Sequence, residues 1–219
     1  MSAKALLRRE LLAARRLLTD QDVERAAGVL ARHALALPEL SGARTVAAYV
    51  SVGREPGTRA LLDALRTRGV RVLLPVLLAD NDLDWAVYEG AEGLVKAGRG
   101  LLEPVGERLG PGAVLEADAV LLPGLAVDAR GMRLGRGGGS YDRVLARLTA
   151  AGAVPALVVL LYADEVTERV PAEPHDFPVH TVVTPQGPRG VGGGATDRGA
   201  GGGARGAVGR GGGGGPRRG

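Results

Sequence analysis

Apolar positions in the first 37 residues repeat every three to four residues, which is the period of an amphipathic helix. The polar residues 19–22 interrupt this series, so we predict a break there, with Thr19 or Asp20 as the N-cap of a second helix. Pro38 sets the end of that second helix near residue 37. The positions in the first series are Leu6, Leu7, Leu11, Ala14 and Leu18.

After Pro38 the pattern changes to short apolar runs separated by single helical stretches. Helical periodicity covers 58–68 and 140–151, and Pro75 is expected to close a strand. Strands joined by single helices require crossover connections, and these produce a mostly parallel sheet with helices on both faces. We therefore predict one α/β domain over residues 1–185, a three-layer sandwich. The predicted strands are 45–50, 70–74, 83–88, 117–122, 154–161 and 179–183.

The last 34 residues differ from the rest of the chain in charge and glycine content. Residues 186–219 hold six of the 28 basic residues, one of the 24 acidic residues and 17 of the 36 glycines. The formal net charge of +4 therefore belongs to this tail, because the body keeps 22 basic and 23 acidic residues. We predict a disordered tail from about Gln186, since it buries too little apolar area to offset the entropy of ordering.

Composition excludes several classes of protein. The chain has no cysteine, which excludes disulfide scaffolds, cysteine nucleophiles and cysteine-based zinc sites, and which fits a cytoplasmic location. No apolar run approaches the ~18 residues of a membrane span, and the N-terminus lacks an apolar signal core, so we expect no membrane partner. The tail resembles RNA-binding Gly-Arg segments but lacks interleaved aromatic residues, so we do not expect a nucleic-acid partner either. We expect a monomer.

The stretch 122–143 follows a predicted strand and leads into a predicted helix. Ligands of open α/β sheets bind at this end of the strands. Glycine N–H groups and the free N–H groups of the next helix turn form an anion cradle, and Arg133 and Arg136 add charge suited to phosphate. The alternative is a flexible loop in a glycine-rich chain, and the stretch is neither a Walker A loop nor a clean dinucleotide fingerprint. The glycines are Gly135, Gly137, Gly138 and Gly139.

Charged residues elsewhere fit the same chemistry. Asp142 lies in the first turn of the predicted helix, where it either complements the helix dipole, with Ser140 as N-cap, or helps to bind Mg²⁺ beside a triphosphate. Asp176 is a second candidate carboxylate for Mg²⁺. Lys4 and Arg8 share one helix face, where like charges repel each other unless an anion binds, and the alternative is a solvated basic face that Arg15 also approaches.

Three further residues are candidates for contact with an organic substrate. Glu55 lies between the strand at 45–50 and a helix, so it is either a helix-start carboxylate or an acceptor for donor groups of a substrate. Tyr141 and Trp85 are each able to stack on a flat ring, and a packing role is the alternative for both.

The run PGLAVDARGMRLGRGGGSYDR resembles the signature of 5-formyltetrahydrofolate cyclo-ligases, also called 5,10-methenyltetrahydrofolate synthetases. The resemblance covers about residues 1–185 and includes the Lys-x-x-x-Arg helix, the strand followed by Glu-x-x-Thr at 45–58, Glu103-Pro104 and the closing HDFPVHTVVTP. It implies a three-layer α/β fold. It also implies conversion of 5-formyltetrahydrofolate, ATP and Mg²⁺ to 5,10-methenyltetrahydrofolate, ADP and phosphate.

The resemblance also implies roles for matching residues. Arg136 and Tyr141 are the implied catalytic residues, Asp142 and Asp176 the implied metal ligands. Glu55 matches a substrate-binding glutamate, and we place Val50 and Trp85 beside it. The implied ATP-binding residues are Lys4, Arg8, Arg133, Leu134, Gly135, Arg136, Gly137, Gly138, Gly139, Ser140 and Tyr141.

This chain departs from the family pattern at two positions. Many members have lysine where it has Gly138, and tyrosine where it has Ser140, which removes a cation from the phosphate side and an aromatic wall from the folate side. Two rival functions stay open at this point. One is a sugar-phosphate isomerase or CoA-transferase-like α/β enzyme that works without ATP, and the other is RNA binding through the Arg/Gly tail.

Overall fold

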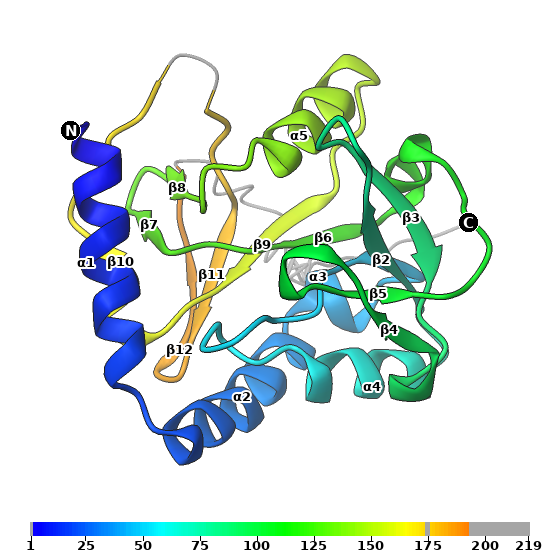
Figure 1. Ribbon diagram of the computed structural model, residues 1–219, viewed down its shortest axis with the longest axis horizontal. Helices are drawn as coiled ribbons and strands as arrows, with labels where there is room; N and C mark the ends of the chain where they lie inside the picture. The colour runs from blue at the N-terminus through cyan, green and yellow to red at the C-terminus, as the bar shows by residue number, and fades with distance from the viewer. Residues whose placement is uncertain (1, 174–175, 193–219) are drawn as a thin grey trace, which may run out of the picture.

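The computed structural model describes residues 2–173 and 176–192, and a seven-stranded sheet in the order β12-β11-β9-β6-β1-β2-β3 forms its centre (Figure 1). Neighbouring strands from β11 to β2 pair in parallel, whereas β12 and β3 run antiparallel at the two edges. The strands are β1 (Thr45–Ala47), β2 (Arg71–Leu77), β3 (Leu83–Val87), β6 (Ala119–Leu122), β9 (Ala156–Leu160), β11 (Thr181–Thr184) and β12 (Gly187–Gly190).

Helices cover both faces of this sheet, which confirms the predicted three-layer fold. Alternate strand residues point to opposite faces, so Leu74 packs with α2 (Asp20–Leu35), α3 (Pro38–Ser41) and α4 (Arg59–Thr67). Its neighbour Leu73 packs on the other face, with α5 (Ser140–Ala150) and the 3₁₀ helix η3 (Pro111–Glu116). Each fully buried leucine of this kind contributes roughly 1.5–3 kcal/mol to folding.

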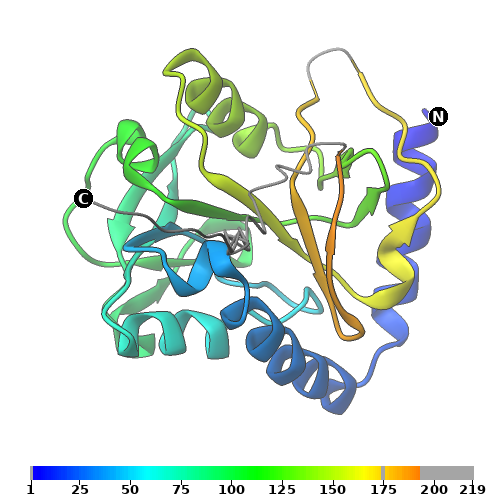
Figure 2. The ribbon, with the colours of Figure 1, turned by 180° about the vertical axis from the view of Figure 1, so that it is seen from behind.

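The first helix lies outside the main sandwich. Figures 1 and 2 place α1 (Ala3–Leu17) at one end of the molecule, alongside β10 (Val166–Thr167). Its apolar stripe, including Leu7 and Leu11, packs on the small sheet that β10 forms with β7 (Ala126–Asp128) and β8 (Arg133–Leu134). Thr19 caps the next helix, because its hydroxyl accepts a hydrogen bond from the Asp22 N–H. The predicted break is confirmed, but it covers only Leu18 and Thr19, because α2 already begins at Asp20.

A small hairpin stands beside the main sheet, next to β2 and β3. It consists of β4 (Leu94–Lys96) and β5 (Leu102–Pro104), which pair antiparallel. Short 3₁₀ turns complete the chain: η1 (Ala91–Gly93), η2 (Gly98–Gly100) and η4 (Ala163–Glu165). Among the described residues, no helix combines the length and the apolar character needed to cross a membrane.

Two predicted boundaries, at Pro75 and in the tail, are wrong, and the strand predicted over 45–50 ends already at Ala47. β2 continues through Pro75, because its pairing with β1 ends at Leu73 and only β3 lies beside it from there on. Residues 187–190, predicted as coil, form β12, because backbone pairing with β11 requires no apolar side chains. The rest of the predicted tail, residues 193–219, lies outside the described residues, and so does any RNA contact it makes.

Candidate functional site

A pocket of about 570 Å³ opens at the carboxyl ends of the parallel strands β1 and β6. The loop after β1, the loop after β6, the start of α1 and the β4–β5 hairpin all contribute to its wall. Apart from Trp85, every residue predicted for the site lines it. These residues are Lys4, Arg8, Val50, Glu55, Arg133, Leu134, Gly135, Arg136, Gly137, Gly138, Gly139, Ser140, Tyr141, Asp142 and Asp176.

The glycine segment, residues 135–139, adopts backbone angles that residues with a side chain rarely adopt. Gly137 and Gly139 have φ values of 93° and 77°, in the left-handed region. Gly139 is the N-cap of α5, so the prediction that Ser140 caps this helix is wrong, and Ser140 instead begins it. The first N–H groups of α5 have no acceptor within the helix, and they and the positive end of its dipole lie next to the pocket-lining glycines. This arrangement suits an anion.

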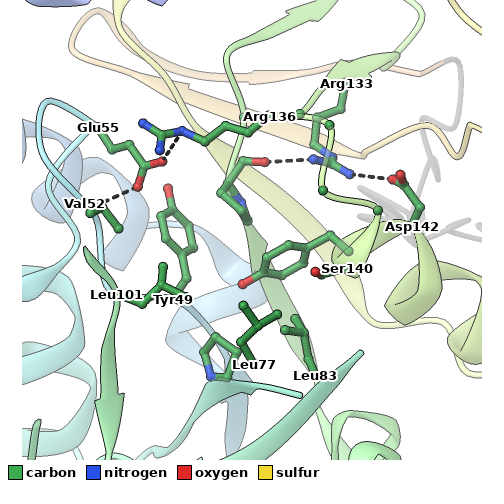
Figure 3. A pocket seen from close by; sticks show the side chains of 18 of the residues that line it. Tyr49, Val52, Glu55, Leu77, Leu83, Leu101, Arg133, Arg136, Ser140 and Asp142 are labelled. Atoms are coloured by element: carbon green, nitrogen blue, oxygen red, sulfur yellow. Dashed lines mark hydrogen bonds and ion pairs between the residues drawn. The ribbon is translucent and has the colours of Figure 1, made fainter. Parts of the chain in front are cut away.

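Arg133 is held beneath this segment. Its Nη1 donates to the Pro123 carbonyl at 2.9 Å and its Nη2 to Asp142 Oδ1 at 3.2 Å (Figure 3). Burial lowers the pKa of the Arg133 guanidinium, and the Asp142 carboxylate opposes that effect. Its buried Nε has no hydrogen-bond partner among the described residues. A fixed cation with a spare donor thus lies under the anion cradle.

The start of α1 closes the pocket from a distant part of the sequence. Arg8 Nε donates to the Gly135 carbonyl at 2.8 Å, which ties the helix to the glycine segment. Lys4 forms ion pairs with Glu173 at 2.7 Å and Asp176 at 2.8 Å. Burial lowers the pKa of Lys4, but the hydrogen bonds to these two carboxylates outweigh it, and the pKa is raised overall. Lys4 stays charged at neutral pH.

Arg15 has a different environment, although it approaches the same helix face. Its side chain is 4% exposed, and its Nε and Nη2 donate to Glu165 at 2.6 and 2.9 Å. Nη2 also donates to the Gly124 carbonyl at 2.8 Å. Arg15 is therefore a buried, ion-paired residue, and the basic stripe on the helix does not reveal this burial from the sequence.

The opposite side of the pocket is built around Glu55. This carboxylate is 7% exposed, accepts a hydrogen bond from the Val52 N–H at 2.8 Å and pairs with Arg136 at 3.1 Å (Figure 3). Burial raises the pKa of the nearby Tyr49 and Tyr141 hydroxyls, so both stay protonated. The buried Tyr141 hydroxyl has no hydrogen-bond partner in the described part of the chain.

The prediction that Trp85 contacts the substrate is wrong in position. Trp85 is fully buried between the sheet and η3, and it does not line the pocket. Trp85 lies two residues after Leu83 in β3, so both side chains point to the same, buried face of the sheet. Leu83 does reach the pocket, along with residues that sequence reasoning missed. Among them are Tyr49, Val52, Leu77, Leu101 and Leu102.

The two carboxylates predicted to bind Mg²⁺ both line the pocket, but each is ion-paired in the structure. Asp142, 48% exposed, pairs with Arg133, and Asp176 with Lys4. The described residues contain no cluster of three or more acidic or histidine side chains that would hold a metal ion alone. Oxygen donors of this kind suit Mg²⁺, which typically takes one or two carboxylates and completes its shell with phosphate oxygens and water.

These features define an α/β protein whose sheet edge carries a pocket lined by basic side chains and a glycine-rich helix start. A family model described as the 5-formyltetrahydrofolate cyclo-ligase family matches residues 1–185. The chain belongs to this family and is a 5-formyltetrahydrofolate cyclo-ligase enzyme of folate and one-carbon metabolism. This confirms the resemblance seen in the glycine signature.

Individual relatives agree with the family match. A 5-formyltetrahydrofolate cyclo-ligase of Mycolicibacterium smegmatis is 45% identical over 191 residues, covering 84% of this chain and 94% of that protein. The Escherichia coli protein of the same name is 31% identical over 173 residues, or 78% and 94% of the two chains. The solved structure of Aquifex aeolicus 5,10-methenyltetrahydrofolate synthetase superposes with a TM-score of 0.73 at 28% identity, covering 86% of this chain and 93% of that one.

Proposed function

We propose that the pocket binds ATP through its phosphates and 5-formyltetrahydrofolate through its far side, and that it transfers the γ-phosphoryl group between them. The observation that carries this proposal is the convergence of Lys4, Arg8 and Arg133 on one glycine-rich helix start. Cations from two separate segments and a row of free N–H groups match the charge and size of a triphosphate. The spare Nε of Arg133 supports an acceptor there.

The folate lies on the side of the pocket that contains Glu55. A buried carboxylate suits the paired N–H donors of a pterin ring, and in this arrangement Arg136 moves from Glu55 toward the phosphates. Val50 and the apolar residues Leu77 and Leu101 supply the flat, dry surface that an aromatic ligand needs. The Tyr141 hydroxyl, which lacks a partner among the described residues, is available to donate to the substrate.

Asp142 and Asp176 are the residues that would hold Mg²⁺. Both belong to the pocket wall, and their partners Arg133 and Lys4 are themselves suited to phosphate, so binding of a nucleotide gives those cations new partners. Mg²⁺ bound there would neutralise charge on the phosphate oxygens.

The protein positions the reactants and stabilises charge, and it forms no covalent intermediate of its own. The formyl oxygen of the substrate attacks the γ-phosphorus, an O–P bond forms, the bond to the β-phosphate oxygen breaks and ADP leaves. The folate N10 then attacks the activated formyl carbon, a C–N bond forms, the C–O bond breaks with release of phosphate, and N10 loses its proton. Lys4, Arg8 and the glycine N–H groups hold the transferred oxygens.

Absorbance of methenyltetrahydrofolate, formed from 5-formyltetrahydrofolate, tests this proposal. We expect product only when ATP and Mg²⁺ are both present. Asp142→Asn should raise the Mg²⁺ concentration needed for half-maximal rate, with partial rescue by excess Mg²⁺. Asp164→Asn is the matched control, because Asp164 is exposed in η4 and lies outside the pocket. An unchanged Mg²⁺ requirement in Asp142→Asn excludes this carboxylate from the metal site.

A further inference from the structure

A second cavity, of about 420 Å³, lies beside the C-terminal half of α1, and Arg136 of the glycine segment also borders it. Four of its five lining residues are arginines: Arg15, Arg16, Arg54 and Arg136, with Leu12 as the fifth. Arg136 also lines the first pocket, so one guanidinium borders both cavities. The proposed cyclisation reaction uses no residue that is confined to this second cavity.

Two of these arginines make contacts that leave part of each guanidinium without a partner among the described residues. Arg15 is held by Glu165 and stacks on the Tyr162 ring at 5.7 Å from its centroid. Arg54 Nη2 pairs with Asp20 at 3.0 Å. The Nη1 atoms of both arginines are buried and have no hydrogen-bond partner among residues 2–173 and 176–192. Buried donors are almost always hydrogen-bonded, so two such atoms beside one cavity indicate a missing acceptor.

Three of the four arginines pair with one carboxylate each, so the arginines of this cavity exceed their carboxylate partners by one charge. Asp20, the partner of Arg54, is 98% exposed, so water screens much of its charge. Arg16 is exposed and has no ion-pair partner in the described part of the chain. Like charges gathered around a concave surface repel one another, and a bound anion relieves that repulsion.

We propose that the cavity formed by Arg15, Arg16, Arg54 and Arg136 is a binding site for a small oxyanion with two or more negative charges. The planar guanidinium fork matches two oxygens of one phosphate or carboxylate group. The anion comes either from a phosphate compound or from a chain of carboxylates. In both cases it competes with Glu55 for Arg136, because that guanidinium borders both cavities.

Calorimetric titration of the full chain at low salt tests this site directly, with inorganic pyrophosphate and tri-γ-glutamate as separate probes. In the double variant Arg16→Ala/Arg54→Ala we expect at least a tenfold loss of affinity for the probe that binds. The control Arg9→Ala/Arg66→Ala removes the same charge from exposed positions away from the cavity, and it should stay within twofold of the wild type.

Pyrophosphate also fits the proposed ATP site, so a third variant separates the two. Binding at the arginine cavity should persist in Lys4→Ala/Arg8→Ala, a result that holds even if the proposed ATP site fails. Binding of pyrophosphate alone identifies the anion as a phosphate compound, and binding of tri-γ-glutamate alone identifies it as a chain of carboxylates. If the double variant is unfolded by circular dichroism, Arg16→Ala alone should still weaken binding at least threefold. Wild-type affinity in the folded Arg16/Arg54 variants, or no binding of either probe, overturns the proposal.

Discussion

The two ends of α1 carry basic residues of the same kind in opposite environments. Near its start, Lys4 and Arg8 line a pocket, and Arg8 contacts the backbone of the glycine segment. Near its end, Arg15 is buried and paired with Glu165. The difference follows from what each end packs against, since the first end meets an open sheet edge and the second meets the turn before β10. Spacing along a helix therefore identifies a face but not the role of each residue on it.

Removal of Arg15 should have the largest effect on stability. Arg15→Ala leaves Glu165 buried without its cation, and breaking a buried pair in this way costs about 3–5 kcal/mol of unfolding free energy. Urea unfolding at neutral pH measures the loss. Arg15→Met/Glu165→Leu, which removes both charges, should recover most of it. A loss within ~0.5 kcal/mol for Arg15→Ala would place Arg15 with the surface residues instead.

Asp128 is a second buried charged residue, and the stability it contributes depends on pH. It is fully buried and accepts hydrogen bonds from the N–H groups of Arg130, Met132 and Val170. Burial raises the pKa of Asp128, but these hydrogen bonds and the Arg130 guanidinium outweigh it, so the pKa is lowered overall. Its stabilisation is therefore complete above the ordinary value near 3.9 and is lost as pH falls through the lower folded value.

Asp128→Asn should accordingly lose about 2–3 kcal/mol at pH 7, the contribution of hydrogen bonds to a charged group. The gap to the wild type should narrow as the pH falls below about 4. Urea unfolding at pH 7, 5 and 3.5 measures both. A gap that stays constant over this range would mean that the carboxylate charge contributes nothing.

A substitution at Gly138 tests whether added positive charge strengthens phosphate binding in the pocket. A Cβ built at Gly138 meets no atom within 4 Å, and its φ lies outside the left-handed region, so a side chain fits there. Gly138→Lys adds a cation beside the proposed phosphate site and should lower the ATP KM by about two- to fivefold, the size of an exposed charge contact. Gly138→Gln is the uncharged control. Equal KM values for the two variants would show that charge at this position does not reach the phosphates.

Much of the fold could be predicted because it depends on local signals. The capping Thr19, the alternation of strands and helices, and the glycine segment before α5 all behave as their sequences indicate. The β12 strand was missed because backbone pairing leaves no mark in side-chain composition. Pro75 was misjudged because its tolerance depends on where β1 stops.

The candidate site, too, was only partly predictable from the sequence. The residues that line the pocket were found where a motif marked them, as in 133–142, but not where they only face it from a distant hairpin, as Leu101 and Leu102 do. Trp85 was misplaced, and the burial of Arg15 was not foreseen, because burial depends on what packs against a face, and this is a tertiary property. Charge and aromaticity indicate what a side chain is able to contact, whereas packing decides what it does contact.

Equilibrium binding of ATP to the wild type, Arg8→Ala and Arg9→Ala tests the central claim that the start of α1 forms the phosphate site. The two arginines are adjacent in α1, but Arg8 lines the pocket and Arg9 is exposed outside it. A charge-assisted phosphate contact contributes ~1.5–3 kcal/mol, so Arg8→Ala should weaken ATP binding roughly 10- to 150-fold while Arg9→Ala leaves it nearly unchanged. Equal affinities for the two variants would contradict the account and remove α1 from the site.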